Sequence, residues 1–174
     1  MRRHNNARGI VMNHLLGTLA AFGVTMALLV GGFLALLGTM QVEGEYLDAE
    51  GVRIHYTDEG EGEPVILIHG LGFNSYLNWY WTGVAGQLLK QHRVIAIDCR
   101  CHGHSDAPAS PELYGKEMAE DVVRVMDKLG IERAHVVGYS LGGFITMKLL
   151  AEHPDRLLSA VPCAAGWARR DVDA

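Results

Sequence analysis

The strongest constraint on the fold is the alternation of short apolar runs with helical patterns from residue 64 onward. Short, largely uninterrupted apolar runs are typical of strands that are buried on both faces of a sheet. Four segments have this character: Pro64–His69, Arg93–Asp98, Ala134–Tyr139 and Leu157–Ala164. The segments between them predict helices: Ser75–Gln91, Lys116–Leu129 and Leu141–Glu152. This alternation predicts an α/β fold with a mostly parallel sheet and flanking helices.

A long apolar segment near the start of the chain predicts a membrane anchor. Leu15–Gly38 holds 24 almost wholly apolar residues, and a helix of that length covers roughly 36 Å, enough to cross a bilayer core of about 30 Å. A secretory signal peptide has a shorter apolar core and a clearer cleavage pattern, although a cleaved signal and a buried helix remain alternatives. We therefore expect residues 1–44 to form a tail and transmembrane anchor, and residues 45–174 to form a second domain that begins with a hairpin, Glu45–Thr57.

The charges around this segment predict its orientation. Arg2, Arg3 and Arg8 precede it, so the positive-inside rule places the N-terminus in the cytoplasm and the rest of the chain on the non-cytoplasmic side. Small residues recur at every fourth position: Gly23, Ala27, Gly31 and Ala35. This spacing permits close helix–helix dimerisation, but small residues are also simply common in membrane helices.

The overall charge excludes nucleic acid as a partner. The chain carries 15 Lys and Arg against 20 Asp and Glu, a formal net charge of −5. Because three of the basic residues precede the apolar segment, the remainder is still more acidic. An acidic domain repels the phosphate backbone, so we expect no nucleic-acid binding.

One motif carries nucleophilic chemistry. Gly138-Tyr-Ser-Leu-Gly142 has the form G-x-S-x-G, and it lies between a predicted buried strand and a predicted helix. A sharp strand-to-helix turn of this kind lifts the serine hydroxyl clear of the sheet, and glycines at 138 and 142 relieve the crowding. The helix that starts there favours developing negative charge. Ser140 is therefore the candidate nucleophile.

Two further segments follow the first two buried strands. His69-Gly70-Leu71-Gly72 is placed to supply an oxyanion-hole amide, with the Leu71 N–H as the first donor and the Leu141 N–H as the second. His69, Gly70, Gly138 and Gly142 would support these two turns. The other segment is Asp98-Cys-Arg-Cys-His-Gly-His-Ser105.

Taken together, these pieces resemble the amino-terminal half of an α/β-hydrolase-fold protein. The matching motifs are HGLG (69–72), D-x-R-x-H-G-x-S (98–105), GYSLGG (138–143) and the helix-closing H-P-x-R (153–156). The resemblance implies a carboxylesterase- or lipase-like serine hydrolase in which Ser140 attacks an ester, thioester, lactone or amide carbonyl of a small acyl substrate. A serine at 140 excludes the dehalogenase and epoxide-hydrolase branches, which have aspartate there. One departure is Cys101, where the family usually has glycine.

The family's remaining catalytic residues are missing. After the serine, the family has an acid and then a histidine, whereas the only later histidine here is His153, which we interpret as a helix-terminating residue. Asp171 or Asp173 is a candidate for the acid, because both follow the last predicted strand, Leu157–Ala164, and a minority of such enzymes place the acid there. We therefore expect a fragment whose fold is incomplete at its C-terminal side, and which is nearly inactive as given because losing the histidine costs about a million-fold.

The sequence gives weaker support for the other candidate sites. Cys99, Cys101, His102 and His104 fit zinc-site spacing poorly, so we expect no metal site and no cofactor. Trp79, Tyr80 and Trp81 are interpreted as helix core rather than as an acyl pocket. The alternative to a hydrolase is a non-catalytic, membrane-anchored half-domain that binds a partner through its open sheet edge.

Overall fold

The computed structural model describes residues 23–32 and 42–166, and the chain divides into two compact units, Met1–Met40 and Gln41–Ala174. In the first unit, residues 23–32 form a helix in which every residue is exposed. The predicted anchor covers residues 15–38, and its residues 15–22 and 33–38 lie outside the described residues. Among the helices that are described, none is both long enough and apolar enough to cross a bilayer.

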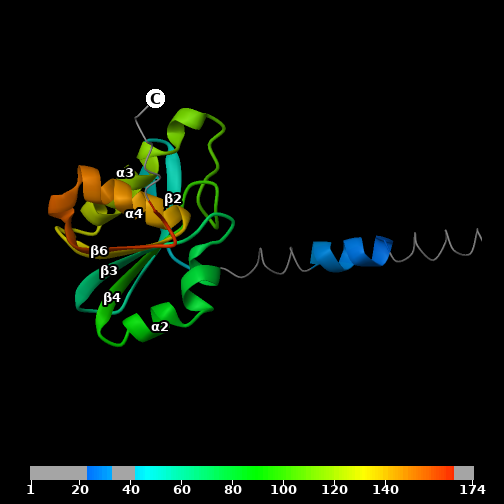
Figure 1. The fold of residues 1–174 in the computed structure, drawn as a ribbon, viewed down its shortest axis with the longest axis horizontal. Coiled ribbons are helices and arrows are strands. Elements are labelled where there is room, and N and C mark those ends of the chain that lie inside the picture. Colours follow the sequence, from blue (N-terminus) through cyan, green and yellow to red (C-terminus); the bar gives the residue numbers. More distant parts are fainter. Residues whose placement is uncertain (1–22, 33–41, 167–174) are drawn as a thin grey trace, which may run out of the picture. The chain divides into compact units, whose positions relative to one another are not determined.

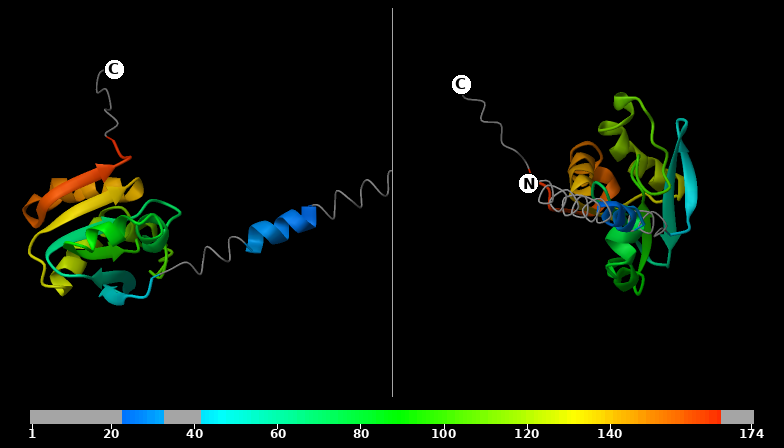
Figure 2. Two further views of the ribbon diagram at one scale, coloured as in Figure 1. Left: turned by 90° about the horizontal axis from the view of Figure 1, so that it is seen from below. Right: turned by 90° about the vertical axis from the view of Figure 1, so that its right-hand side faces the viewer.

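The second unit is built on a six-stranded sheet with the order β1-β2-β4-β3-β5-β6. Its strands are β1 (Glu45–Ala49), β2 (Val52–Glu59), β3 (Glu63–Ile68), β4 (His92–Ile97), β5 (Ala134–Tyr139) and β6 (Leu157–Cys163). The first two strands form the predicted hairpin, and β2 joins β4 in antiparallel fashion. The pairs β3–β4, β3–β5 and β5–β6 are parallel. The mostly parallel sheet predicted from the apolar runs is confirmed, and Figure 2 shows its twist.

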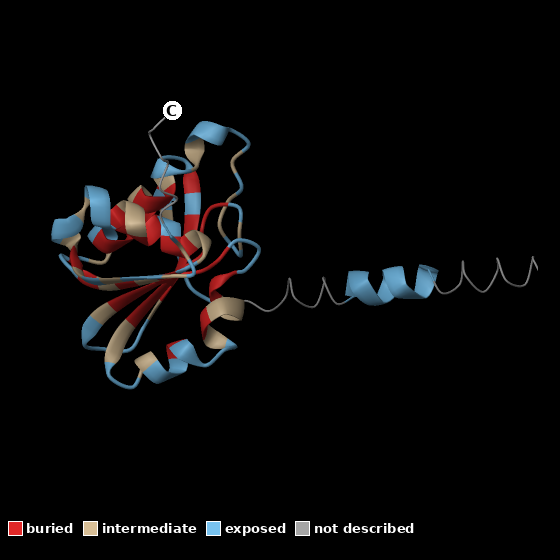
Figure 3. Cartoon of the chain, viewed as in Figure 1, coloured by how far each residue is buried: buried red, intermediate tan, exposed pale blue. Residues whose placement is uncertain are grey.

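Helices cover both faces of the sheet, which explains why the central strands are apolar throughout. Helices α3 (Lys116–Lys128) and α4 (Leu141–Glu152) lie on one face, and α2 (Val84–Leu88) lies on the other (Figure 1). In β3, Ile66 and Ile68 pack into the core under α3 and α4, whereas Val65 and Leu67 pack toward α2. All four are buried, and Figure 3 shows the central strands as the most buried part of the unit.

The helix predicted over Lys116–Leu129 is confirmed as α3. Four of its apolar residues are buried against the sheet: Met118, Val122, Val125 and Met126. Their spacing of three and four residues places them on one helix face.

The single helix predicted over Ser75–Gln91 is wrong. The segment forms a π-helical turn, η1 (Tyr76–Tyr80), and then the short α2. Gly83 separates them with a φ of +79°, a left-handed conformation that interrupts right-handed helix. The tryptophans divide accordingly: Trp79 is buried in the core toward α2 as predicted, whereas Trp81 is 69% exposed.

The last described strand, β6, lies at the edge of the sheet. Within the described residues β6 pairs with β5 alone, and Val161 on it is exposed. Between α4 and the end of β6 lies an open, mostly apolar hollow of about 370 Å³. Its walls include Met147 and Leu150 of α4, and Pro162 and Ala165 at the end of β6.

Candidate functional site

Ser140 lies at the turn between β5 and α4 in a conformation that is rare for a residue with a side chain. Its φ is +52° and its ψ is −108°. The backbone is held on both sides, because the Ser140 N–H donates to the Cys163 carbonyl (2.9 Å) and the Ser140 carbonyl accepts from the Phe144 N–H (3.1 Å). A strained serine that its surroundings fix so firmly is typical of a functional position.

The two flanking glycines are required by close approaches at this turn. A Cβ on Gly138 would collide with the Gly142 carbonyl oxygen and the Thr146 hydroxyl, and a Cβ on Gly142 would collide with the Ile68 carbonyl oxygen. The sharp turn therefore exists only if both positions lack side chains.

The loop after β3 lies directly beside Ser140. Ile68 is the parallel partner of Gly138, so the two strands end side by side. The Gly142 N–H donates to the His69 carbonyl (3.1 Å), and a Cβ on Gly70 would lie 3.4 Å from the Ser140 Cβ. Residues 70–73, which we call the oxyanion loop, thus adjoin the serine.

Two backbone amides near the serine are not engaged. In the described part of the chain, neither the Leu71 N–H nor the Leu141 N–H donates a hydrogen bond. Leu141 is the first residue of α4, where amides are free and the helix dipole is positive. Leu141 follows Ser140 directly, and Leu71 belongs to the loop that adjoins it, so both amides are near the serine.

The His69 side chain supports the loop as a neutral ring. Its Nε2 accepts from the Cys99 N–H (2.9 Å), so Nδ1 carries the proton and donates to the Gly70 carbonyl (2.8 Å). Burial lowers the pKa of His69 to about 4. Because the ring is neutral at physiological pH and both of its nitrogens are hydrogen-bonded to the backbone, His69 supports the loop structurally and does not carry protons.

Sequence reasoning missed the role of Asp98 at the end of β4. Its carboxylate accepts from the Ser75 N–H (2.8 Å), from the His104 N–H (3.1 Å) and from His55 Nδ1 (2.9 Å). Burial opposes ionisation, but these hydrogen bonds outweigh it and lower the pKa of Asp98 to about 2. Asp98 thereby ties β2 and the start of η1 to the loop that follows β4. The only sequence signal was the D-x-R-x-H-G-x-S motif.

A general base for Ser140 is not present among the described residues, in which no histidine is hydrogen-bonded to the Ser140 side chain. His153 caps the far end of α4, roughly 18 Å along the helix from Ser140, which agrees with its interpretation as a helix terminator. Asp171, the candidate acid, lies outside the described residues.

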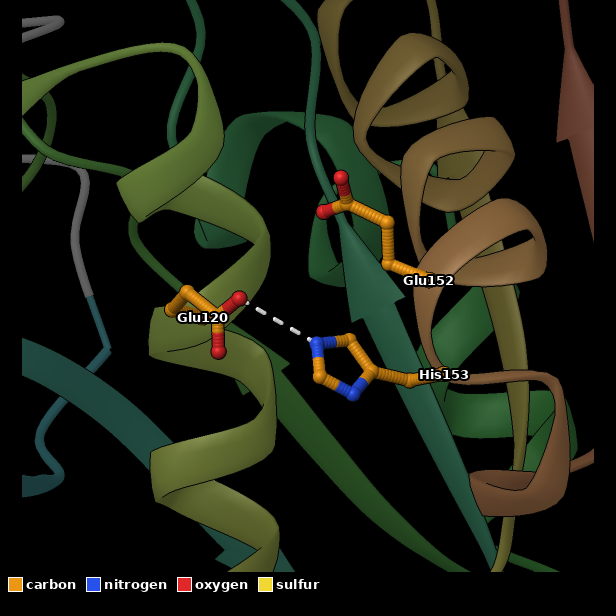
Figure 4. A group of neighbouring side chains, drawn as sticks. All are labelled: Glu120, Glu152 and His153. Carbon is orange, nitrogen blue, oxygen red and sulfur yellow. Dashed lines mark hydrogen bonds and ion pairs between the residues drawn. The ribbon is translucent and has the colours of Figure 1, made fainter.

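His153 belongs instead to an interhelical cluster with Glu120 and Glu152 (Figure 4), whose candidate ligand atoms lie within 4.8 Å of one another. His153 Nε2 is 3.2 Å from a Glu120 oxygen. Each carboxylate also has a lysine partner: Lys148 bonds Glu152 at 2.6 Å, and Lys116 is 3.9 Å from Glu120. The contact between His153 and Glu120 joins α4 to α3, whereas each lysine pair lies within one helix.

Comparison with known proteins decides the family. The family model of the alpha/beta hydrolase fold matches residues 63–172. The chain belongs to the α/β-hydrolase fold family. The dihydrolipoyllysine-residue acetyltransferase component of the acetoin cleaving system of Cupriavidus necator is 40% identical over 119 residues, 66% of this chain and 30% of that protein. The 2-hydroxymuconate semialdehyde hydrolase of a Pseudomonas species is 37% identical over 114 residues, 66% of this chain and 40% of that enzyme.

A solved structure gives the same answer. The structure described as "Est816 as an N-Acyl homoserine lactone degrading enzyme" aligns with a TM-score of 0.59 and 39% identity, over 65% of this chain and 42% of that one. This α/β-hydrolase-fold chain therefore spans less than half the length of these relatives.

Proposed function

We propose that the protein is a serine hydrolase that acts on an ester, thioester, lactone or amide carbonyl through an acyl-enzyme on Ser140. One observation carries the proposal: Ser140 is held at a positive φ beside two unengaged amides, those of Leu71 and Leu141. Hydrolases among the relatives, including a lactone-degrading enzyme, support the reaction class.

In the proposed reaction, the Ser140 oxygen bonds to the carbonyl carbon while a general base takes the hydroxyl proton. The carbonyl oxygen becomes an oxyanion, which the Leu71 and Leu141 amides hold with two hydrogen bonds. When the intermediate collapses, the bond to the leaving group breaks and the leaving group takes the proton. Water then attacks the acyl-enzyme and releases the acid and free Ser140.

The base and its acid are proposed to be residues that this chain does not contain. A hydroxyl without a base is a weak nucleophile, and loss of the histidine alone costs about a million-fold in a related serine enzyme. The 174-residue chain alone should therefore be nearly inactive, and a longer natural form should be active.

The proposed location is the membrane. The apolar character of residues 15–38 supports a single anchor with a cytoplasmic N-terminus and the hydrolase domain on the non-cytoplasmic side. Within this segment, Val24, Leu28 and Leu29 are exposed on the described helix. A helix–helix dimer through the small residues Gly23, Ala27, Gly31 and Ala35 is part of this proposal.

A second candidate is a non-catalytic module that binds a partner through its open edge. Two observations favour it: the unpaired side of β6 and the apolar hollow beside α4. The two candidates differ in whether Ser140 reacts.

Fluorophosphonate labelling of the protein in its natural full length tests the proposal. The wild type should be labelled, and Ser140→Ala should abolish labelling. Ser159→Ala is the matched control, because Ser159 is an exposed serine on β6 that already lies 2.7 Å from His135 Nδ1 yet stands outside the turn at residue 140, so its removal should change nothing. An unlabelled wild type would overturn the hydrolase and leave the binding module.

A further inference from the structure

The oxyanion loop is held by a side chain from a distant part of the sequence. Three of its hydrogen bonds are local: the Gly70 N–H donates to the Asn78 side-chain oxygen (3.0 Å), and the Gly70 carbonyl accepts from the Phe73 N–H (3.2 Å) and from His69 Nδ1 (2.8 Å). A fourth reaches 30 positions along the chain, where the Gly72 N–H donates to His102 Nε2 (3.1 Å). Gly72 immediately follows Leu71, whose amide is the proposed oxyanion donor.

The His102 ring is itself fixed. Because Nε2 accepts a hydrogen bond, Nδ1 carries the proton and donates to the Arg100 carbonyl (2.9 Å). The ring also lies against the His69 ring, with centroids 5.1 Å apart. The orientation of the His102 ring is therefore fixed by a hydrogen bond at each nitrogen and by contact with the His69 ring.

Arg100 connects this ring to a rigid helix. Its buried guanidinium donates to both carboxylate oxygens of Asp121 in α3, at 2.6 and 2.8 Å, and to the Leu113 carbonyl at 2.7 Å. Such bidentate pairs fix geometry well. The path from α3 through Arg100 and His102 to Gly72 consists of hydrogen bonds of ordinary length.

We propose that His102 is a positioning residue that, by accepting the Gly72 N–H, holds the oxyanion loop where the Leu71 amide meets the developing oxyanion. This role rests on the proposed hydrolase function. Removal of a complete oxyanion donor costs about 10²- to 10³-fold, and a misplacement of about 1 Å can cost 10²-fold. Loss of the acceptor at residue 102 should therefore slow acylation of Ser140 by about 10- to 100-fold.

The test compares two side chains at this position in the full-length protein. His102→Phe keeps a ring against His69 but has no acceptor, whereas His102→Gln places an amide oxygen near the position of Nε2. His104→Phe is the matched control, since it makes the same change two residues away, where the ring makes an edge-to-face contact with His55 and no contact with the oxyanion loop is found among the described residues. His102→Met supplies a second side chain without a nitrogen or oxygen acceptor if the Phe variant does not fold.

Two measurements are made on each variant: the second-order rate of fluorophosphonate labelling and the hydrogen exchange of the peptide that covers residues 69–74. The Phe variant should label about 10- to 100-fold more slowly and exchange faster, and the Gln variant should recover most of both. If the wild type is labelled but the Phe variant is labelled equally fast, the role of His102 is overturned. The same holds if the Gln variant is labelled as slowly as the Phe variant. In both cases the proposed hydrolase function stands. An unlabelled wild type would overturn the proposed function and this role with it.

Discussion

The backbone at Ser140 should store free energy that a glycine would release. A non-glycine residue in a sparsely populated conformation costs about 1–3 kcal/mol, and Ser140 has a φ of +52°. Ser140→Gly removes the Cβ that causes this cost, but the greater freedom of glycine in the unfolded chain returns about 0.5–1 kcal/mol. The variant should therefore be more stable than the wild type by about 1 kcal/mol, within a range of about 0–2.5 kcal/mol, although it can no longer form an acyl-enzyme.

Ser140→Ala is the matched control, because it removes the same hydroxyl but keeps the Cβ. The Ser140 hydroxyl has no hydrogen-bond partner among the described residues, so the alanine variant should stay within about 0.5 kcal/mol of the wild type. Urea unfolding followed by tryptophan fluorescence, with Trp79 buried in the core, gives the midpoints from which the free energies of unfolding are compared. A glycine variant no more stable than the alanine variant would refute the claim that the turn is strained.

Four further results are expected. Because burial lowers the pKa of His69 from 6.5 to about 4, the unfolded chain binds a proton between these pH values that the folded chain does not. The wild type should therefore lose about 3 kcal/mol of stability as the pH falls from 6.5 to 4, and urea unfolding should show a smaller loss in His69→Gln; equal losses would contradict the buried neutral ring. Cys101→Gly should raise the free energy of unfolding by about 0.5–2 kcal/mol, because Cys101 has a φ of +69°, and an unchanged urea midpoint would contradict this. Gly142→Ala should lower the melting temperature by an amount equivalent to about 1–3 kcal/mol, because the methyl group would collide with the backbone of Ile68; a near-neutral effect would mean that the turn is not tightly packed. Zinc at roughly 100 µM should shift the melting temperature by less than about 1 °C, because lysines already pair both carboxylates of the interhelical cluster, and a rise of several degrees would instead indicate a metal site there.

The parts of the fold that were predictable from the sequence are those with local, strong patterns. The buried parallel strands follow from uninterrupted apolar runs such as Pro64–His69, because only strands covered on both faces need to be apolar throughout. The turn at Ser140 follows from the G-x-S-x-G motif, because a side chain at either Gly138 or Gly142 would collide with neighbouring atoms. The helix of α4 was predicted with its observed bounds, since it begins at this motif and ends before His153-Pro154.

The parts that were missed depend on contacts between distant residues. Asp98 joins His55 and Ser75, which lie 43 and 23 positions earlier in the chain, and no local pattern reveals such a pairing. The same is true of the hydrogen bond between Gly72 and His102. The segment Ser75–Gln91 had helical periodicity, but Gly83 and the packing of Trp79 into the sheet divided it into two short turns.

Trapping of the acyl-enzyme tests whether Ser140 is the nucleophile. The full-length protein is mixed with 4-nitrophenyl acetate, quenched in acid within the first turnover, digested, and analysed by mass spectrometry. An acetyl group is expected on the Ser140 hydroxyl of the wild type, and none on that peptide in Ser140→Ala. Hydrolysis of the ester without an acetylated Ser140, or no hydrolysis at all, would contradict this role of Ser140.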